Sequence, residues 1–207
     1  CCSSSYSCGN VVLSFGLDGS LIGLKDGASL WSDPHHPLVA VRYKSYSSSD
    51  VEHFRSTYCM SNASWVAHDY GKPDMPTDTL GKIWTPTVVE IYVEEKKEKK
   101  KKKKKKEEEN NKDENAVSSS CMYVVHATFD GQAANEEYGA VSDVFTNYTV
   151  LLDSDNGLSS VSVTMGMFNK TTTRLPESMF VQFHPLLDDG SWEASSLGSW
   201  LNPYDVL

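Results

Sequence analysis

Short runs in which apolar and polar residues alternate recur along this chain, and they constrain its fold more than any other feature. Within residues 158–168, every second side chain from Val161 to Met167 is apolar, and residues 179–183 repeat the pattern. Alternation with a period of two indicates a strand with one face on a core. Further strand-like runs lie at residues 11–15, 21–24, 38–43, 82–93, 121–129 and 141–152.

Turn signals separate these runs at intervals of about 8–15 residues, which is typical of antiparallel sandwiches. The Asp18-Gly19 dipeptide predicts a type I′ hairpin turn, which needs positive φ at both central residues. One short helix is expected at residues 50–58, as a connector that packs on the core. Its apolar face consists of Val51, Phe54 and Tyr58. Because no long helix alternates with the strands, we predict a mainly β, antiparallel β-sandwich.

We expect a single β-sandwich domain over residues 11–207, after a disordered or truncated start at residues 1–10. A low-complexity, highly charged insert interrupts this domain at residues 94–116. Such a composition buries too little apolar surface to offset the entropy of ordering, so we expect a solvated loop or a frayed helix. Residues 88–93 and 122–129 are then predicted to be the two strands of one hairpin, with the insert as their connection.

Charge is unevenly distributed along the chain, whose formal net charge is −9 at pH 7. Residues 94–115 hold 11 lysines and 8 acidic residues, so the rest of the chain, with 8 basic and 20 acidic residues, lies near −12. An acidic body disfavours non-specific nucleic-acid binding, and we expect no specific nucleic-acid partner. The consecutive lysines of residues 99–106 leave open an interaction through a basic tract, although acidic residues flank it on both sides.

Features that report on the cellular compartment are few. No apolar run approaches the roughly 20 residues that span a membrane, and no signal peptide is visible. Five cysteines leave their pairing open, and none of their spacings matches a zinc site. Sequons at Asn62, Asn147 and Asn169 are candidate N-glycosylation sites. They favour a secretory or extracellular location, with unmodified Ser/Thr-rich turns as the alternative.

The sequence carries no recognisable catalytic or metal-binding motif. The patterns GxSxG, GxxxxGK[ST], GxGxxG, HxD and HExxH are absent. His35 and His36 lie between two prolines and are interpreted as loop residues. His68 and Asp69 would point to opposite faces of a strand, which disfavours a shared metal ion. We therefore predict no catalytic residue, no metal site and no cofactor in this chain.

Two opposite charges flank the Leu175-Pro176 dipeptide, between the strand-like runs of residues 158–168 and 179–183. Proline biases the residue before it toward an extended conformation, so Arg174 and Glu177 are expected to lie close enough to pair. A structural ion pair that fixes a corner of the sheet is the simpler interpretation. A pair that contacts a substrate in a cleft is the alternative.

The same region carries the most specific pattern in the chain, N-K-x-x-T-R-L-P-E at residues 169–177, followed by F-x-x-F-x-P at residues 180–185. It resembles a poorly characterised family, the domain of unknown function numbered 5054, whose members look like distant relatives of the family 38 glycoside hydrolases, the α-mannosidases. The resemblance covers nearly the whole chain except residues 1–10 and 94–116. Further matching pieces follow in the same order: residues 15–24, Trp31, residues 36–38, Arg42-Tyr43, Asp50, Phe54, Tyr58, Trp65, residues 69–73, Tyr138-Gly139, Trp192, Leu197-Gly198 and residues 202–206.

This resemblance implies a C-terminal β-domain of the galactose mutarotase-like supersandwich type, as a fragment of a larger protein of carbohydrate metabolism. In α-mannosidases the hydrolytic machinery lies upstream, in a barrel-like domain where His and Asp residues hold a zinc ion. Those motifs have no counterpart here, so the resemblance implies a non-catalytic chain that supports an upstream barrel of the same protein. Arg174, Glu177 and His184 are the candidates for the edge of a shared substrate cleft. The charged insert departs from the family pattern and puts the local hairpin in doubt.

Two other functions stay open at this stage. A stand-alone carbohydrate-binding module would use exposed aromatic rings, although large aromatic side chains are also natural core residues. The candidate rings are Trp31, Trp65, Trp192 and Trp200. The other function is that of an interaction protein that binds its partners through the lysine tract of residues 99–106.

Overall fold

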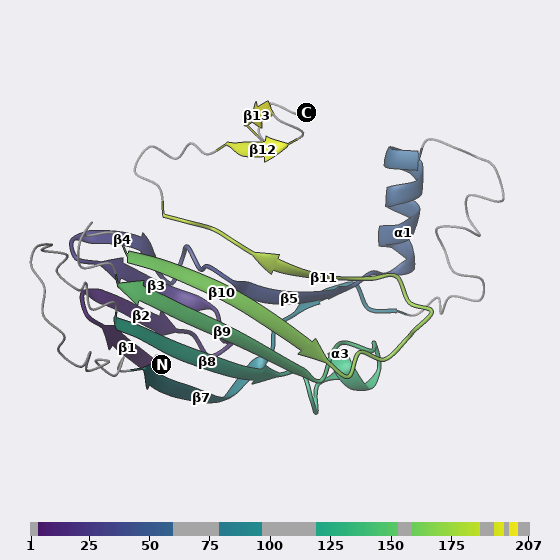
Figure 1. The fold of residues 1–207 in the computed structure, drawn as a ribbon. Coiled ribbons are helices and arrows are strands. Elements are labelled where there is room, and N and C mark those ends of the chain that lie inside the picture. The colour runs from purple at the N-terminus through teal and green to yellow at the C-terminus, as the bar shows by residue number, and fades with distance from the viewer. Residues whose placement is uncertain are drawn as a thin grey trace, which may run out of the picture.

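The computed structural model describes residues 4–59, 79–96, 119–152, 159–186, 193–196 and 199–202. These residues form mainly antiparallel β structure with one short helix, α1 (Ser48–Phe54), and a single helical turn, α3 (Ala133–Glu136) (Figure 1). The predicted fold class is therefore confirmed at the level of a mainly β, antiparallel fold.

Two four-stranded sheets make up the body of the molecule. The N-terminal sheet has the strand order β1-β2-β3-β4, and the central sheet has the order β10-β9-β8-β7. The strands of the N-terminal sheet are β1 (Ser4–Cys8), β2 (Val11–Phe15), β3 (Leu21–Asp26) and β4 (Ser29–Ser32). Those of the central sheet are β7 (Thr87–Lys96), β8 (Ser119–Thr128), β9 (Asp143–Leu152) and β10 (Ser159–Phe168).

The two four-stranded sheets share one hydrophobic core in a sandwich-like arrangement. Alternate residues of β2 and of β9 are buried, as the period-two pattern of the sequence predicts. The core side chains from both sheets and the connection to β5 are Cys8, Val11, Leu13, Phe15, Leu21, Val39, Tyr123, Val125, Tyr148 and Val150. A disulfide between Cys8 of β1 and Cys121 of β8 also joins the two sheets.

A third sheet, called here the joining sheet, has the order β11-β5-β6. Its strands are β5 (Ala40–Ser45), β6 (Lys82–Trp84) and β11 (Glu177–Gln182). Its inner face packs on the α3 end of the central sheet through a second core cluster, which consists of Val41, Tyr43, Phe129, Ala134, Ala140, Val141 and Val144. A separate two-stranded hairpin, β12 (Ala194–Ser196) and β13 (Ser199–Leu201), lies close to the C-terminus.

The start of the chain differs from the prediction. Residues 1–10 were expected to be disordered or truncated, yet residues 4–8 form β1 and pair with β2. The Tyr6 ring lies 5.9 Å from that of Phe15 and 5.5 Å from that of Tyr123. Aromatic packing and the Cys8 disulfide thus hold a segment whose small polar residues gave no strand signal.

The turn at Asp18-Gly19 is also different from the type I′ turn that we predicted. Gly19 has a φ of 77°, but Asp18 is not among the residues with positive φ. The Gly16 amide donates to the Ser20 carbonyl at 2.9 Å, and the Gly19 amide donates to the Gly16 carbonyl at 3.0 Å. A longer loop with one left-handed glycine therefore connects β2 and β3. In this loop the Asp18 carboxylate accepts hydrogen bonds from Ser20 and Arg42.

The predicted helix is present, but its packing is not the predicted one. α1 begins at a capping box of Ser47 and Asp50 and continues into a π-helical turn at Arg55–Cys59. None of the residues of α1 is buried; the Phe54 side chain is 41% exposed and that of Tyr58 is 79% exposed. The two rings stack on each other at 5.3 Å, because positions i and i+4 of a helix lie on the same face. The helix projects from the sheets instead of packing on the core (Figure 1).

The predicted hairpin around the charged insert is confirmed. β7 and β8 pair in antiparallel register from Thr87↔Thr128 to Lys96↔Ser120, with one bulge near Val89. The first three residues of the insert as predicted, residues 94–96, belong to β7. The prediction placed the boundary too early because the strand continues through charged residues that its hairpin partner holds in register. Residues 97–118 lie outside the described part of the chain.

Candidate functional site

Glu177, one of the three cleft candidates, is the centre of a polar joint between the joining sheet and the central sheet. It is the first residue of β11 and pairs with Ser45 of β5. Its carboxylate accepts the Tyr43 hydroxyl at 2.6 Å and the Lys170 ammonium at 2.7 and 2.9 Å. Thr173 donates a longer bond of 3.3 Å. With a side chain only 18% exposed, the carboxylate is fully engaged by these groups.

Tyr43 extends this joint to the turn at α3. Its side chain is completely buried, and its hydroxyl contacts both the Glu177 carboxylate and the Tyr138 backbone carbonyl. Burial raises the pKa of Tyr43, and the hydrogen bond to the neighbouring Glu177 carboxylate adds to the effect. The hydroxyl therefore keeps its proton and acts as a donor at physiological pH.

Gly139 lets the loop before β11 approach the same joint. Its φ is 75°, a conformation that favours glycine. A Cβ atom at this position would lie 2.4 Å from Thr173 Cγ2 and 3.0 Å from the Thr171 carbonyl oxygen. The Tyr138 carbonyl thus accepts a hydrogen bond from the Tyr43 hydroxyl, and the missing side chain of Gly139 leaves room for residues 171–173.

Glu177, which was predicted to pair with Arg174, forms an ion pair with Lys170, which was not predicted from the sequence. Arg174 is exposed in the loop before β11, next to the buried Leu175. The Pro176 carbonyl accepts the Tyr46 amide at 3.1 Å and so continues the pairing between β11 and β5. The bonds of Glu177 match the structural interpretation, in which a charged pair fixes a corner of the sheet.

His184 lies at the other end of β11, so the structure does not bring the three cleft candidates together. It lies seven residues after Glu177 along this segment, which corresponds to roughly 20 Å for an extended chain. Its amide donates to the Pro37 carbonyl at 3.1 Å, and its ring centre lies 4.7 Å from that of His36. Glu177 thus belongs to the joint, whereas His184 belongs to a pair of imidazoles near β4.

His35 and His36 lie in a tight turn, as predicted. Asp33 Oδ1 accepts the amides of both histidines and the His36 Nδ1 atom, each at 2.8 Å. The hydrogen bond from the His36 ring, followed by those from the backbone, lowers the pKa of Asp33. Within the described residues, no group of three His, Cys, Asp or Glu side chains is arranged to hold a metal ion.

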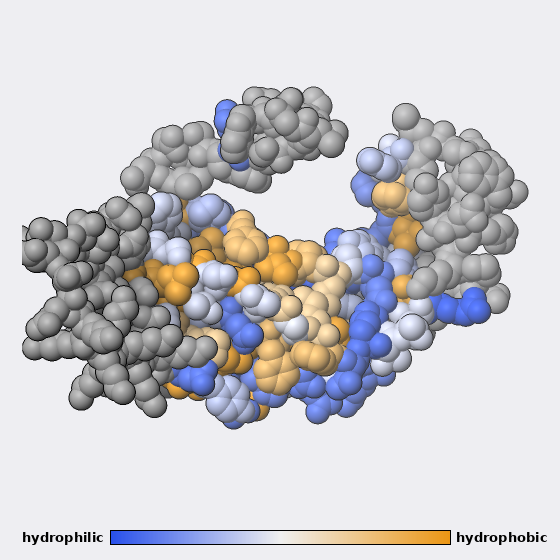
Figure 2. Space-filling view, viewed as in Figure 1, coloured by the Kyte–Doolittle hydropathy of each residue, from blue (hydrophilic) through white to orange (hydrophobic). Residues whose placement is uncertain are grey.

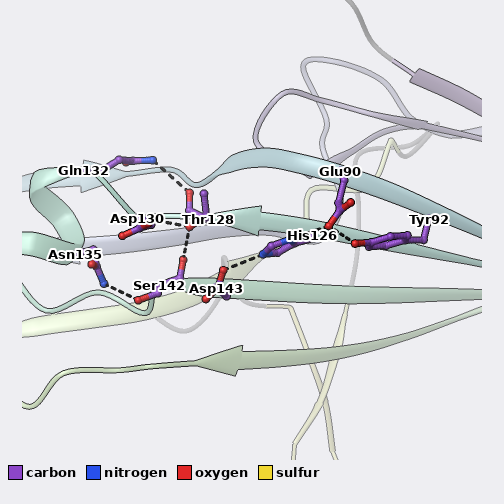
Figure 3. Close-up of polar contacts among 9 residues, drawn as sticks. All are labelled: Glu90, Tyr92, His126, Thr128, Asp130, Gln132, Asn135, Ser142 and Asp143. Carbon is purple, nitrogen blue, oxygen red and sulfur yellow. Dashed lines mark hydrogen bonds and ion pairs between the residues drawn. The ribbon is translucent and has the colours of Figure 1, made fainter.

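A second polar cluster, which was not predicted, lies on the outer face of the central sheet (Figure 3). His126 of β8 contacts a carboxylate on each side: its Nε2 lies 2.8 Å from Asp143 of β9, and its Nδ1 lies 3.6 Å from Glu90 of β7. Tyr92 donates a hydrogen bond to Glu90. The Phe145 ring stacks on the imidazole at 4.2 Å with an interplanar angle of 6°. Five side chains from three strands thus form one cluster on this face of the sheet.

The surrounding hydrogen bonds in Figure 3 serve mainly to shape the α3 turn. Thr128 donates to the Ser142 carbonyl at 2.7 Å and accepts the Asp130 amide at 2.9 Å. Asn135 donates to the Ala140 carbonyl at 2.6 Å and to the Ser142 hydroxyl at 3.3 Å. These bonds fix the turn that presents Tyr138 and Gly139 to the Glu177 joint. Only cross-strand register assembles the His126 cluster, so no sequence spacing could have indicated it.

Of the four tryptophans that could stack on a sugar, the structure describes the side chain of one. Trp31 is 49% exposed at the end of β4, and its carbonyl accepts the Leu186 amide at 2.9 Å. The side chains of Trp65, Trp192 and Trp200 lie outside the described part of the molecule. Of the candidate glycosylation sites, Asn147 and Asn169 are described and Asn62 is not.

No known protein family, curated protein or solved structure matches this chain. In the part of the chain that the structure describes, no helix is long and apolar enough to cross a membrane.

Proposed function

We propose that this chain is the non-catalytic β-domain of a glycoside-hydrolase-like protein and supports an upstream catalytic barrel of the α-mannosidase type. The proposal includes the finer fold assignment, a supersandwich of the galactose mutarotase-like type. The zinc-dependent chemistry of that family belongs to the barrel. The role of the present chain is to provide a rigid surface on which the barrel packs.

The observation that carries this proposal is that the segments by which the chain resembles the family meet in space. Tyr43, Tyr138 and Glu177 come from three separate segments, and all three contribute to one joint. Gly139 makes room for the loop of residues 171–173 at the same place. Contacts between these segments support a fold shared with the family, because residues that contact one another limit which side chains each position can hold.

A second contact between such segments supports the same conclusion. Arg42 of β5 forms an ion pair with Asp18 of the β2–β3 loop at 2.8 Å. Burial opposes ionisation of Asp18, but hydrogen bonds from Ser20 and from Arg42 outweigh it and lower the pKa of the carboxyl group. The charged pair thus ties the N-terminal sheet to the joining sheet, and both partners lie in family-like segments.

The surface near β11 provides apolar contact area for a neighbouring domain. Phe180 projects from the face of β11 opposite the core and is 39% exposed, and Phe183, just beyond the strand, is 62% exposed. Trp31 is exposed near the same end of β11, where its carbonyl binds Leu186. We propose that the barrel covers this surface, which includes His184 at the edge of the cleft.

A disulfide between the two main sheets supports a secretory or extracellular location as part of this proposal. Disulfides persist in oxidising compartments and are rare in the cytosol. The Cys8–Cys121 bond closes a sequence separation of 113 residues and lies at the edge of the main core.

Two measurements test the proposed function. The purified chain should release no detectable product from aryl α-mannosides, with or without added zinc. The native protein, captured from its source with an antibody to this chain, should be larger than 23.0 kDa and should hydrolyse such substrates in a zinc-dependent manner. Zinc-dependent turnover by the chain alone, or a native protein without an upstream barrel, would contradict the proposal.

A further inference from the structure

One of the three sequons lies in the middle of β9, with its side chains on the outer face of the central sheet. Tyr148 and Val150 point into the core and are completely buried. Because side chains alternate along a strand, Asn147 and Thr149 point to the opposite, outer face. Both residues of the sequon that the glycosylation reaction requires are therefore on the side of the sheet that faces solvent.

An aromatic ring adjoins this sequon on the same face. Phe145 precedes Asn147 by two residues, so both side chains leave β9 on the outer face. The ring is held by His126, on which it stacks at 4.2 Å, and by Phe168, whose ring centre lies 5.7 Å away in an edge-to-face arrangement. Phe145 therefore offers a fixed apolar surface beside the Asn147 side chain.

The neighbours of Asn147 across the sheet leave space above it. In the register of the sheet, Asn147 lies opposite Val124 of β8 and Thr164 of β10, which are both small side chains. Thr164 is exposed. Figure 2 shows apolar side chains gathered over the middle of the molecule in this view, with small polar ones between them. Phe145, two residues before Asn147 on the same face of β9, is an aromatic ring within reach of a bulky group on Asn147.

We propose that Asn147 carries an N-linked glycan whose first sugar packs against Phe145. In the reaction, the Asn147 amide nitrogen loses a proton and bonds to the C1 atom of an oligosaccharide. The bond from C1 to the pyrophosphate of the lipid-linked donor breaks, and the lipid pyrophosphate leaves. The apolar C–H face of the first sugar then covers the exposed side of an aromatic ring, which removes apolar surface from water.

The compartment that this modification requires agrees with an independent feature of the molecule. N-glycosylation of Asn-X-Ser/Thr occurs on secreted proteins, which are also the proteins that form disulfides. The Cys8–Cys121 disulfide thus points to the same route. Asn169 begins another sequon in an exposed segment, but the side chain two residues before it is Met167 and not an aromatic ring.

Peptide mapping tests the site. The full chain is secreted from a eukaryotic host as wild type, Thr149→Val and Thr149→Ser. Because serine preserves the sequon and valine removes it at similar size, the peptide that contains Asn147 should carry a glycan in the wild type and in Thr149→Ser only. An unmodified Asn147 in the secreted wild-type protein overturns the proposal, and so does a glycan that persists in Thr149→Val.

A comparison of melting temperatures tests the contact with Phe145. Wild type and Phe145→Leu are each made with the glycan trimmed to one sugar, and each without glycan in the bacterial periplasm, where disulfides still form. The single sugar should raise the wild-type Tm by about 2–4 °C, as expected for an aromatic contact in a chain of this size. The gain should fall below about 1 °C in Phe145→Leu and persist in Phe145→Tyr. An equal gain in wild type and Phe145→Leu rules out the contact.

A glycan on Asn147 also limits where a partner domain can bind. It would keep the outer face of the central sheet in solvent, so that a docked barrel would lie elsewhere. The glycan proposal does not depend on the glycoside-hydrolase proposal. Failure of the mapping experiment leaves the β11 surface available for docking, and failure of the activity assays leaves the glycan in place.

Discussion

Glycines with positive φ play different roles in this molecule, depending on what surrounds them. Gly131 has a φ of 70° and no atom within 4 Å of the position that a Cβ would take. Gly139 has nearly the same φ, of 75°, but lies against the backbone and side chains of residues 171–173. Substitution of Gly131 therefore costs only the free energy of placing a side chain in the left-handed conformation, whereas substitution of Gly139 also creates a steric clash.

We expect Gly139→Ala to destabilise the protein by about 2–5 kcal/mol, since the left-handed conformation costs about 1–2 kcal/mol and overpacking adds about 1–3 kcal/mol. Gly131→Ala is the matched control and should cost only about 1–2 kcal/mol. Urea denaturation gives both free energies of unfolding. Equal losses for the two variants would show that the loop of residues 171–173 does not press on Gly139.

The two buried tyrosine hydroxyls differ in whether they have a hydrogen-bond partner. Among the described residues, the Tyr148 hydroxyl is buried with no hydrogen-bond partner, whereas that of Tyr43 contacts Tyr138 and Glu177. Tyr148→Phe should therefore be neutral or slightly stabilising at pH 7, because it removes an unsatisfied polar group. Tyr43→Phe should cost about 1–3 kcal/mol, because it removes the single hydroxyl donor that the Tyr138 carbonyl and the Glu177 carboxylate share. A larger loss in Tyr148→Phe than in Tyr43→Phe would contradict this assignment.

Alkaline pH should reveal the buried tyrosines through their shifted titration. Burial raises the pKa of Tyr148, and the nearby negative charge of Asp18 adds to the effect. A pKa that is higher in the folded state gives stability that is complete below the unfolded value of about 10 and is lost above it. Between pH 10 and 11, the free energy of unfolding of Tyr148→Phe should fall less than that of wild type, by about 1 kcal/mol. Parallel pH profiles for the two proteins would indicate that Tyr148 titrates normally in the folded state.

At the scale of elements, the cross-strand register creates contacts that no single strand contains. The cluster on the outer face of the central sheet exists because Glu90 pairs with His126, and His126 pairs with Phe145. The joint at Glu177 exists because β11 pairs with β5 and not with β10, which precedes it in the sequence. The disulfide is likewise a contact between elements, because it connects the first strand of one sheet to an inner strand of the other.

Removal of this disulfide should destabilise the protein substantially. The bond closes a long loop, so the double variant Cys8→Ala/Cys121→Ala should lose about 2–4 kcal/mol of unfolding free energy. The wild-type Tm should fall on addition of a reductant, whereas the Tm of the double variant should not change. Thermal denaturation with and without reductant measures both effects. Insensitivity of the wild-type protein to reductant would show that the two thiols are not joined.

At the scale of the whole molecule, two cores hold three sheets together. The larger core lies between the N-terminal and central sheets, and the smaller one lies between the joining sheet and the α3 end of the central sheet. Met165 of β10 packs against both clusters and so connects them. Because the charged insert connects neighbouring strands β7 and β8, the pairing of those strands does not require a connection of any particular length.

Replacement of residues 97–118 by a short glycine-containing turn should therefore preserve the fold. Loop closure depends only weakly on length, so the free energy of unfolding should stay constant or rise by up to about 2 kcal/mol. Far-UV circular dichroism and urea denaturation measure the result. Retention on a heparin column, if the full chain shows any, should disappear with the lysine tract. Loss of the folded state on replacement would show that the insert contributes to the core.

The sequence by itself determined most of the longer strands, the β7–β8 hairpin and the mainly antiparallel β class, because period-two alternation and turn residues act over a few neighbouring positions. It also predicted an ion pair for the Glu177 carboxylate. Only the tertiary structure decided what that carboxylate contacts, since Tyr43 lies 134 residues away in the chain and the cation Lys170 was not predicted from the sequence. Long-range pairing of strands leaves no local pattern, and for the same reason the His126 cluster and the Cys8–Cys121 bond became visible only in the folded molecule.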